Sequence, residues 1–194
     1  WGDATPPKPE WNWWSPAEDE RATQWRTTPY TIDWNDDGLM DLIMLDAEGY
    51  LAYFERAKEG DELVLRPGEH IFYGIDAGAY DNRNNVTDKE PGPLQLNSGL
   101  HGGSGRRKLA FTDWDQDGDL DLILNGLNAV WFENTGESDG RVNLRYRGNI
   151  SEQKLAGHTT SPTIVDWNKD GIPDLLLGAE DGFFYYLKNQ HSNE

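Results

Sequence analysis

The sequence from 110 to 124 reads Ala-Phe-Thr-Asp-Trp-Asp-Gln-Asp-Gly-Asp-Leu-Asp-Leu-Ile-Leu, and it occurs in two further versions. Residues 30–44 read Tyr-Thr-Ile-Asp-Trp-Asn-Asp-Asp-Gly-Leu-Met-Asp-Leu-Ile-Met, and residues 163–177 read Thr-Ile-Val-Asp-Trp-Asn-Lys-Asp-Gly-Ile-Pro-Asp-Leu-Leu-Leu. Each version places apolar residues on both sides of the pattern Asp-x-[Asp/Asn]-x-Asp-Gly-x-x-Asp. Such repetition is typical of a protein built from stacked copies of one supersecondary unit.

The similarity continues downstream of each acidic loop. An apolar run is followed by a short turn and then by a run rich in aromatic residues, at 50–54, 129–132 and 183–187. Apolar and aromatic runs separated by Gly, Asn and Asp turns predict antiparallel strands joined as hairpins. We expect a fourth strand at Glu62–Arg66 and at Val142–Arg147. The sequence therefore predicts an all-β fold of β-propeller blades, each with four antiparallel strands.

The repeats divide the chain into five segments. We expect an N-terminal aromatic and Pro-rich segment at 1–27, blade repeats at 28–73, 106–150 and 151–194, and an insertion loop at 74–105. A long loop in a compact fold is either functional or disordered, and the sequence leaves both readings open. Three blades do not close a propeller, for which four is the usual minimum. We therefore expect the chain to be part of a larger propeller.

The acidic loops carry the oxygen ligands that calcium prefers. Alternate side chains point inward, Gly permits the bend, the seventh residue offers its backbone carbonyl and the ninth closes the shell. The predicted ligands of the three Ca²⁺ sites are Asp33, Asn35, Asp37, Leu39 and Asp41; Asp113, Asp115, Asp117, Asp119 and Asp121; and Asp166, Asn168, Asp170, Ile172 and Asp174. The second site has one more carboxylate than the others, and we expect it to bind calcium most tightly.

Two other interpretations of these loops compete with the calcium sites. An EF-hand has the same opening but needs Glu at the twelfth position and flanking helices, whereas this chain has Met44, Leu124 and Leu177 there. Acidic turns without metal are common singly, but three copies in one register disfavour that reading. A Trp follows the first Asp of every loop, and we expect these rings to pack between blades rather than to contact a ligand.

Composition excludes several classes of protein. Of 194 residues, 35 are acidic and 17 are Lys or Arg, which gives a formal charge of −18 and argues against a nucleic-acid partner. The chain has no Cys, so disulfides and thiolate metal sites are excluded. No apolar run is long enough to span a membrane.

The loops and their flanking strands resemble FG-GAP/VCBS-type repeats, the calcium-loop blades of integrin-like β-propellers. In that family the calcium loop joins the first two strands of a blade, which implies the ligands named above. The Phe-Gly and Gly-Ala-Pro signatures of the repeat are absent, apart from a partial echo at Gly178-Ala-Glu. The resemblance therefore favours a bacterial secreted or surface protein over an integrin chain, and such proteins are often linked to carbohydrate-active enzymes.

The first functional hypothesis is a non-catalytic module that binds a glycan or polysaccharide. Aromatic residues outside the core repeats support it, because flat rings stack on sugar faces. The candidate ligand-binding residues are Trp13, Trp14, Tyr80 and Arg106, and Trp25 and Trp131 belong to the same aromatic excess. Rings that fill gaps between blades are the competing reading. Trp13 and Trp14 are adjacent, so in an extended segment only one of them would face a ligand.

Two alternatives remain. The first alternative is that the chain is part of a polysaccharide lyase or another carbohydrate-active enzyme, and a lyase needs a base and a cation. We assign no catalytic residue, but His101, Arg106 and Tyr80 are the candidates. A structural or protein-interaction propeller, attached to other domains of a longer parent chain, is the second alternative. Calcium loops of this kind suit millimolar external calcium, so we expect a secreted, periplasmic or cell-surface location.

Overall fold

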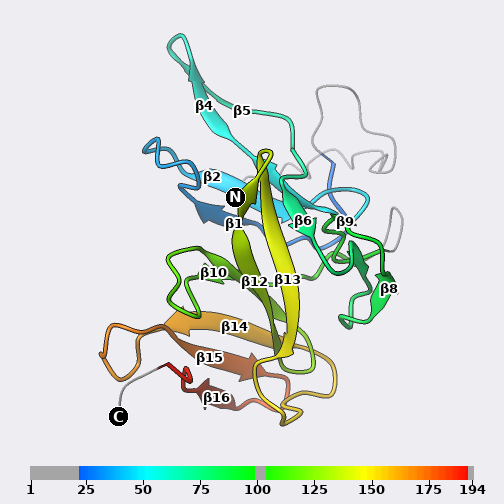
Figure 1. The fold of residues 1–194 in the computed structure, drawn as a ribbon, viewed down its shortest axis with the longest axis vertical. Helices are drawn as coiled ribbons and strands as arrows, with labels where there is room; N and C mark the ends of the chain where they lie inside the picture. Colours follow the sequence, from blue (N-terminus) through cyan, green and yellow to red (C-terminus); the bar gives the residue numbers. More distant parts are fainter. Residues whose placement is uncertain (1–21, 99–103, 192–194) are drawn as a thin grey trace, which may run out of the picture.

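A computed structural model describes residues 22–98 and 104–191 as an all-β structure. Sixteen strands and no helix occur in these two ranges, which confirms the predicted fold class. No helix of membrane-spanning length and apolarity is found in the described part of the chain. The expectation of stacked antiparallel units is also met, since three sheets lie one above another along the long axis of the molecule in Figure 1.

Each repeat forms an antiparallel meander, and the acidic loop joins its first two strands. The last residue of the first strand pairs with the ninth residue of the loop in every repeat, as Ile32 does with Asp41. The strands are β1 (Tyr30–Ile32), β2 (Asp41–Leu45) and β3 (Leu51–Phe54); β10 (Leu109–Thr112), β11 (Asp121–Asn125), β12 (Ala129–Ser138) and β13 (Arg141–Asn149); and β14 (Thr160–Val165), β15 (Asp174–Ala179) and β16 (Phe184–Leu187).

Alternate side chains of each sheet fill the spaces between neighbouring repeats, because successive residues of a strand point to opposite faces. On β11, Leu122 and Leu124 pack in the larger core with residues of the first repeat such as Ile43. Ile123, between them, packs in the smaller core with Leu175 of the third repeat. The central sheet is thus buried on both faces, and it connects the two cores.

The Trp of each loop packs toward the repeat that follows. Trp34 meets Phe111 of the second repeat edge-on, with ring centroids 5.4 Å apart. Trp114 is buried in the core shared with the third repeat. Both agree with the predicted packing between blades. Trp167, in the last repeat, has no following sheet among the described residues, and it is 60% exposed.

Within the described ranges, the predicted fourth strand joins the sheet in only one of the three repeats. In the second repeat β13 completes a four-stranded meander as expected. In the first repeat β5 (Glu62–Leu65) pairs instead with β4 (Arg56–Glu59), and the two form a separate ribbon that projects from the molecule (Figure 1). The ribbon has almost no buried side chain, so it lacks an apolar face to hold it on the sheet. The third repeat has only three strands in the described range.

The segment predicted as an insertion loop at 74–105 is largely folded into the core. Strand β6 (Phe72–Gly74) leads into this segment, which contains β7 (Ala79–Tyr80), β8 (Val86–Asp88) and β9 (Gly92–Pro93). β6 pairs in parallel with β13 and antiparallel with β9, so the sheet of the second repeat has six strands. Leu94 and Leu96 are fully buried beside it. Only residues 99–103 of this segment lie outside the described residues.

A histidine and a carboxylate join the segment before β6 to the turn after β2. Nε2 of His70 lies 2.7 Å from a carboxylate oxygen of Asp46, and the His70 ring lies against Tyr50 at 4.6 Å. The hydrogen bond with Asp46 raises the pKa of His70 above its ordinary value of 6.5, although partial burial opposes the shift. The protonated imidazolium is therefore favoured by folding.

We expect this contact to make stability weakly dependent on pH. Because the folded-state pKa is raised, the contribution is complete below the ordinary pKa and is lost as the pH rises through the raised one. The pair is partly exposed, so the loss should be less than about 1 kcal/mol. Urea unfolding between about pH 5.5 and 8.5 should show it, and His70→Gln should reduce the pH dependence in this window. His158→Gln, at an exposed histidine, is the control; an unchanged profile in His70→Gln would contradict the assignment.

Candidate metal centres and a polar cleft

The three acidic loops share one backbone shape. The fourth and sixth residues of each adopt left-handed backbone angles, with φ of 57° at Asp36 and 87° at Gly38 in the first loop. Gly is favoured at the sixth position because it adopts positive φ without strain. The three loops lie on the same side of the stacked sheets, at the left in Figure 1.

The first loop satisfies its own polar groups. Asp33 accepts the backbone N–H groups of Asp37 at 3.0 Å and Gly38 at 2.9 Å. The side-chain amide of Asn35 donates to the Asp37 carboxylate at 3.4 Å, and Asp37 accepts the N–H of Leu39 at 2.8 Å. An amide placed beside a carboxylate offsets its negative charge by hydrogen bonding.

The third loop repeats this arrangement. Asn168 donates its amide to Asp170 at 2.9 Å, and Asp166 accepts the N–H of Asp170 at 3.1 Å. The N–H of Ile172 donates to Asp170 as that of Leu39 does to Asp37. The first and third loops are thus held together by internal hydrogen bonds, and their role as metal ligands remains a prediction.

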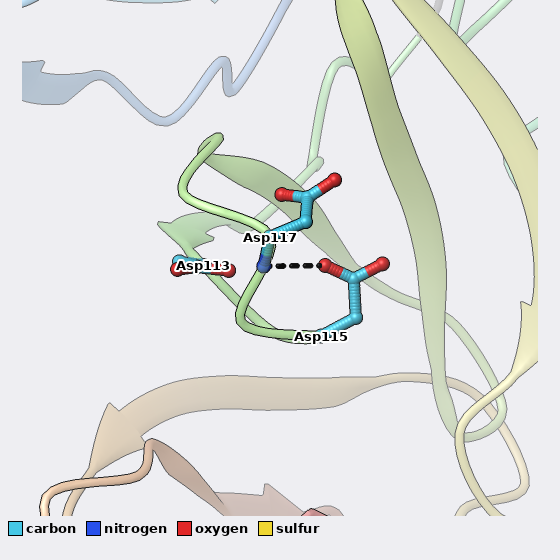
Figure 2. Close-up of side chains that lie close together, drawn as sticks. All are labelled: Asp113, Asp115 and Asp117. Carbon is cyan, nitrogen blue, oxygen red and sulfur yellow. Dashed lines mark hydrogen bonds between the residues drawn. The ribbon is translucent and has the colours of Figure 1, made fainter.

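The second loop differs because Asp115 stands where the others have Asn. Figure 2 shows Asp113, Asp115 and Asp117 along the loop, with the Asp117 amide donating to Asp115. One ligand atom from each of the three lies within 4.8 Å of the others. Partial burial and the neighbouring Asp117 raise the pKa of Asp115, as expected of a carboxylate near like charges. The backbone N–H of Asp117 offsets part of this repulsion, but this loop has no side-chain amide in the position of Asn35 and Asn168.

An oxygen of Asp113 supports a cation at this loop. Oδ1 is buried and has no hydrogen-bond partner, whereas the matching Asp33 accepts an N–H there. A buried acceptor without a partner is costly, and a hard cation would satisfy it. The donor set of three carboxylates, with the carbonyl of Asp119 beyond the bend, therefore fits Ca²⁺. Such an ion would hold the loop closed and offset most of the negative charge of these three carboxylates.

The ninth aspartates have a structural role that the sequence did not reveal. Asp41, Asp121 and Asp174 are fully buried. Asp41 accepts the N–H of Trp34 at 3.0 Å, the hydroxyl of Tyr53 at 2.9 Å and the N–H of Arg56 at 2.8 Å. The carboxylate thus ties the acidic loop to the end of the third strand.

The same connection recurs in the other repeats. Asp121 accepts the N–H of Trp114 at 3.0 Å and that of Asn134 at 2.7 Å, and Asp174 accepts from Trp167 and Asn189. Burial raises the pKa of Asp121 to about 7 even though these hydrogen bonds favour the charged form. The prediction that these residues close the metal shell is untested, and each already has backbone donors to satisfy.

A strand–acidic loop–strand unit that recurs in stacked antiparallel sheets is the arrangement that the sequence predicted, and it agrees with one comparison. Residues 113–177 match the family described as FG-GAP-like repeat. The chain carries an FG-GAP-like repeat. The match runs from the first aspartate of the second loop into β15, so it includes both the second and the third loops. Comparison with curated proteins and with solved structures found no match.

A polar cleft lies at the opposite end of the FG-GAP-like repeats from the acidic loops. Arg106 precedes β10, Asn125 ends β11 and Thr159 precedes β14, whereas the acidic loops follow β10 and β14. The volume of the cleft is about 590 Å³. Its lining consists of one indole side chain, Trp25, and nine residues with polar side chains, which are Asp81, Asn82, Arg83, Asn85, Ser104, Arg106, Asn125, His158 and Thr159.

One wall of the cleft is a turn at 81–85 that is held in place from behind. Asp81 accepts the N–H groups of Arg83 at 2.8 Å and Asn85 at 2.9 Å, and Asn84 adopts a φ of 64°. The buried guanidinium of Arg107 donates to the Asn82 carbonyl at 2.9 Å and to the Asn84 side chain. The segment before β10 therefore fixes the turn from the insertion.

The structure separates the residues proposed for ligand binding and catalysis. Arg106 is exposed and lines the cleft as a ligand-binding residue should. Tyr80 does not, which corrects its assignment to either role: it is 1% exposed, and its ring packs against Phe132 at 5.1 Å. Trp13, Trp14 and His101 lie outside the described residues.

Two further aromatic residues have clear positions. Trp131 is partly buried in the core between the second and third repeats, as the competing packing reading expected. Trp25 is 45% exposed and lines the cleft. The sequence reasoning did not single out the turn at 81–85 or His158 as partners of Arg106. The cluster of Asp and Asn around Arg83 was the signal for a rigid turn, because these side chains bond to nearby backbone.

Proposed function

We propose that this FG-GAP-type protein is a calcium-stabilised module that binds carbohydrate in the cleft beside Trp25. The observation that carries the proposal is the lining itself, in which one exposed indole ring lies among amide, hydroxyl and guanidinium groups. Sugars present apolar C–H faces and polar hydroxyl edges, so such a lining complements them. A pocket with only apolar side chains, or a flat surface, would not complement the two kinds of sugar surface.

The geometry of Trp25 supports stacking. The guanidinium of Arg26 lies over the ring at 3.7 Å from its centroid, but Arg26 is not part of the cleft lining. One face of the indole is thus in contact with its neighbour, and Trp25 remains 45% exposed at the cleft. The backbone of Trp25 is held in place, because its carbonyl accepts the N–H of Gly105 at 2.8 Å. A residue with a fixed backbone and a contacted ring loses less conformational entropy on binding.

Binding is preferred to catalysis because the two catalytic candidates that the structure describes, Tyr80 and Arg106, do not lie in one site. A lyase requires a base and a cation within reach of one substrate. Tyr80 is buried in the core, and of the remaining candidates only Arg106 lies in the described cleft. A binding module needs no base. The lining therefore favours recognition of a glycan or polysaccharide.

Calcium gives the module its proposed setting. The second acidic loop offers three carboxylates and one buried oxygen without a partner, and loops of this type suit millimolar calcium. We therefore propose that the protein is a secreted, periplasmic or cell-surface molecule. In that setting calcium would stiffen the repeats, and the cleft at their other end would recognise the ligand.

Replacement of the exposed indole tests the carbohydrate proposal. Trp25→Ala should lower the affinity for a glycan first identified on an array by roughly tenfold, because stacking and its buried area are lost. Isothermal titration calorimetry measures the change. Trp167→Ala is the matched control, since Trp167 is even more exposed but lies outside the cleft. Equal affinity of Trp25→Ala and the unchanged protein for every glycan bound would overturn the proposal.

A further inference from the structure

The charge of the cleft is opposite to that of the protein. Acidic residues outnumber Lys and Arg by 35 to 17 in the whole chain. In the cleft lining, two arginines and a histidine stand against a single carboxylate, that of Asp81. A cleft lined by one sign of charge attracts ligands of the opposite sign, even when the net charge of the protein repels them.

No carboxylate of residues 22–98 or 104–191 forms a salt bridge with either cleft arginine, Arg83 or Arg106. By contrast, Arg66, Arg145 and Arg147 each lie within 4.0 Å of a Glu or Asp oxygen. The charge of Arg106 is felt by its neighbour, because burial and the nearby Arg106 together lower the pKa of Lys108. The guanidinium groups thus remain available to an anion.

The lone carboxylate of the cleft is already satisfied. One oxygen of Asp81 accepts the backbone N–H groups of Arg83 and Asn85, and the other accepts the side-chain amide of Asn85 at 2.9 Å. All three of these hydrogen bonds lie within the turn at 81–85. Asp81 therefore stabilises the turn that carries Arg83, and it forms no salt bridge with the cleft arginines.

Arg107 adds a third guanidinium behind the cleft wall. Its side chain is buried, it donates to the Asn82 carbonyl and the Asn84 side chain, and its Nε has no hydrogen-bond partner. Burial lowers the pKa of Arg107 to about 9, and the nearby Asp81 offsets part of this effect. We assign Arg107 as a positioning residue that orders the turn holding Arg83.

We propose that the cleft selects acidic carbohydrates, with Arg83 and Arg106 pairing with a carboxylate or sulfate while Trp25 stacks on the sugar ring. This inference rests on the proposed function and narrows it to one class of ligand. Guanidinium groups suit both anions, since each presents two oxygens to the paired N–H donors. The carboxylate would come from a uronic acid, and the sulfate from a sulfated sugar.

Three probes of matched size test this selectivity at one fixed calcium concentration. They are a short glucuronate-containing oligosaccharide, the carboxyl-methyl ester of the same oligosaccharide, and a sulfated galactan oligosaccharide without uronate. Calorimetry should show at least one acidic probe binding about tenfold more tightly than the ester. Added salt should weaken binding of that acidic probe more than binding of the ester.

The variants locate the effect in the cleft. Arg83→Gln and Arg106→Gln should each weaken binding of the preferred acidic probe about five- to tenfold and leave the ester unaffected. Lys58→Gln removes the same charge from the exposed β4–β5 ribbon and should change neither. Circular dichroism confirms that each variant is folded. Preference for the uronate or for the sulfate identifies the source of the anion, and either preference supports the inference.

The outcomes separate the inference from the proposed function. Equal binding of the acidic probes and the ester, with sensitivity to Trp25→Ala, would overturn the selectivity and leave a neutral carbohydrate site. Acid preference that survives both arginine replacements would overturn the assignment of these residues. Absence of binding to any probe and to every glycan on an array would overturn the proposed function itself.

Discussion

Calcium added to chelator-treated protein is expected to raise the midpoint of thermal unfolding by about 5–10 °C. A single site at about 100 times its dissociation constant stabilises a folded protein by about 2.7 kcal/mol, and a domain of this size gains roughly 2–4 °C for each kcal/mol. The physical source is the second loop, where Asp113, Asp115 and Asp117 lie together and one Asp113 oxygen has no partner. Differential scanning calorimetry measures the shift.

Reciprocal variants identify the loop responsible. Asp115→Asn gives the second loop the same side chains as the first at its first, third and fifth positions, and it should remove the tightest step of a calcium titration. Asn35→Asp makes the opposite exchange in the first loop and should add a tight step there. If Asp115→Asn kept the tightest step and the full thermal shift, the second loop would not be the strongest site.

Asp121→Ala is expected to destabilise the protein by about 2–4 kcal/mol, a large part of the stability of an ordinary domain. The carboxylate is fully buried and accepts the backbone N–H groups of Trp114 and Asn134. Its removal leaves two buried donors without acceptors, and each costs about 1–3 kcal/mol. Urea unfolding followed by tryptophan fluorescence gives the change in the free energy of unfolding.

The measurement is made with chelator and with calcium to separate two roles. A destabilisation of the same size in both conditions assigns the effect to the protein hydrogen bonds of Asp121. A destabilisation seen only with calcium would contradict this account and make Asp121 chiefly a metal ligand. Asp119→Asn is the control, because its side chain is exposed and its backbone carbonyl is unchanged.

The features predicted correctly from the sequence are those set by local pattern. Repeated loops between apolar runs gave the strand pairs β1–β2, β10–β11 and β14–β15, because alternation and turn chemistry act over a few residues. The Trp at the second position of each loop also packed as expected in two of three repeats. Trp167 is the exception, because the burial of this ring requires a neighbouring sheet and not only its own loop.

The features that were missed depend on distant partners. Tyr80 lies in a polar stretch that reads as a surface loop, yet its ring fills the core beside Phe132 because β6 and β9 join the sheet of the second repeat. The cleft gathers Trp25, Arg83 and Arg106 from separate parts of the chain. The local pattern of apolar and polar residues does not predict contacts between residues that are distant in sequence. Arg107 is adjacent to Arg106 in sequence but is buried, and only the fold distinguishes them.

The parallel pairing of β6 with β13 has a consequence for how this chain can be rearranged. Strand β6 lies at the end of the first repeat in sequence but hydrogen-bonds in the sheet of the second, so backbone pairing crosses the boundary between those two repeats. The sheet of the third repeat contains only its own strands, and it meets the second repeat through side chains and through a backbone hydrogen bond from Thr160 to the Gly126 carbonyl in the turn after β11. Duplication, deletion or exchange of a single repeat would therefore keep all strand pairing intact only if that repeat is the third. The first and second repeats would have to be duplicated, deleted or exchanged together.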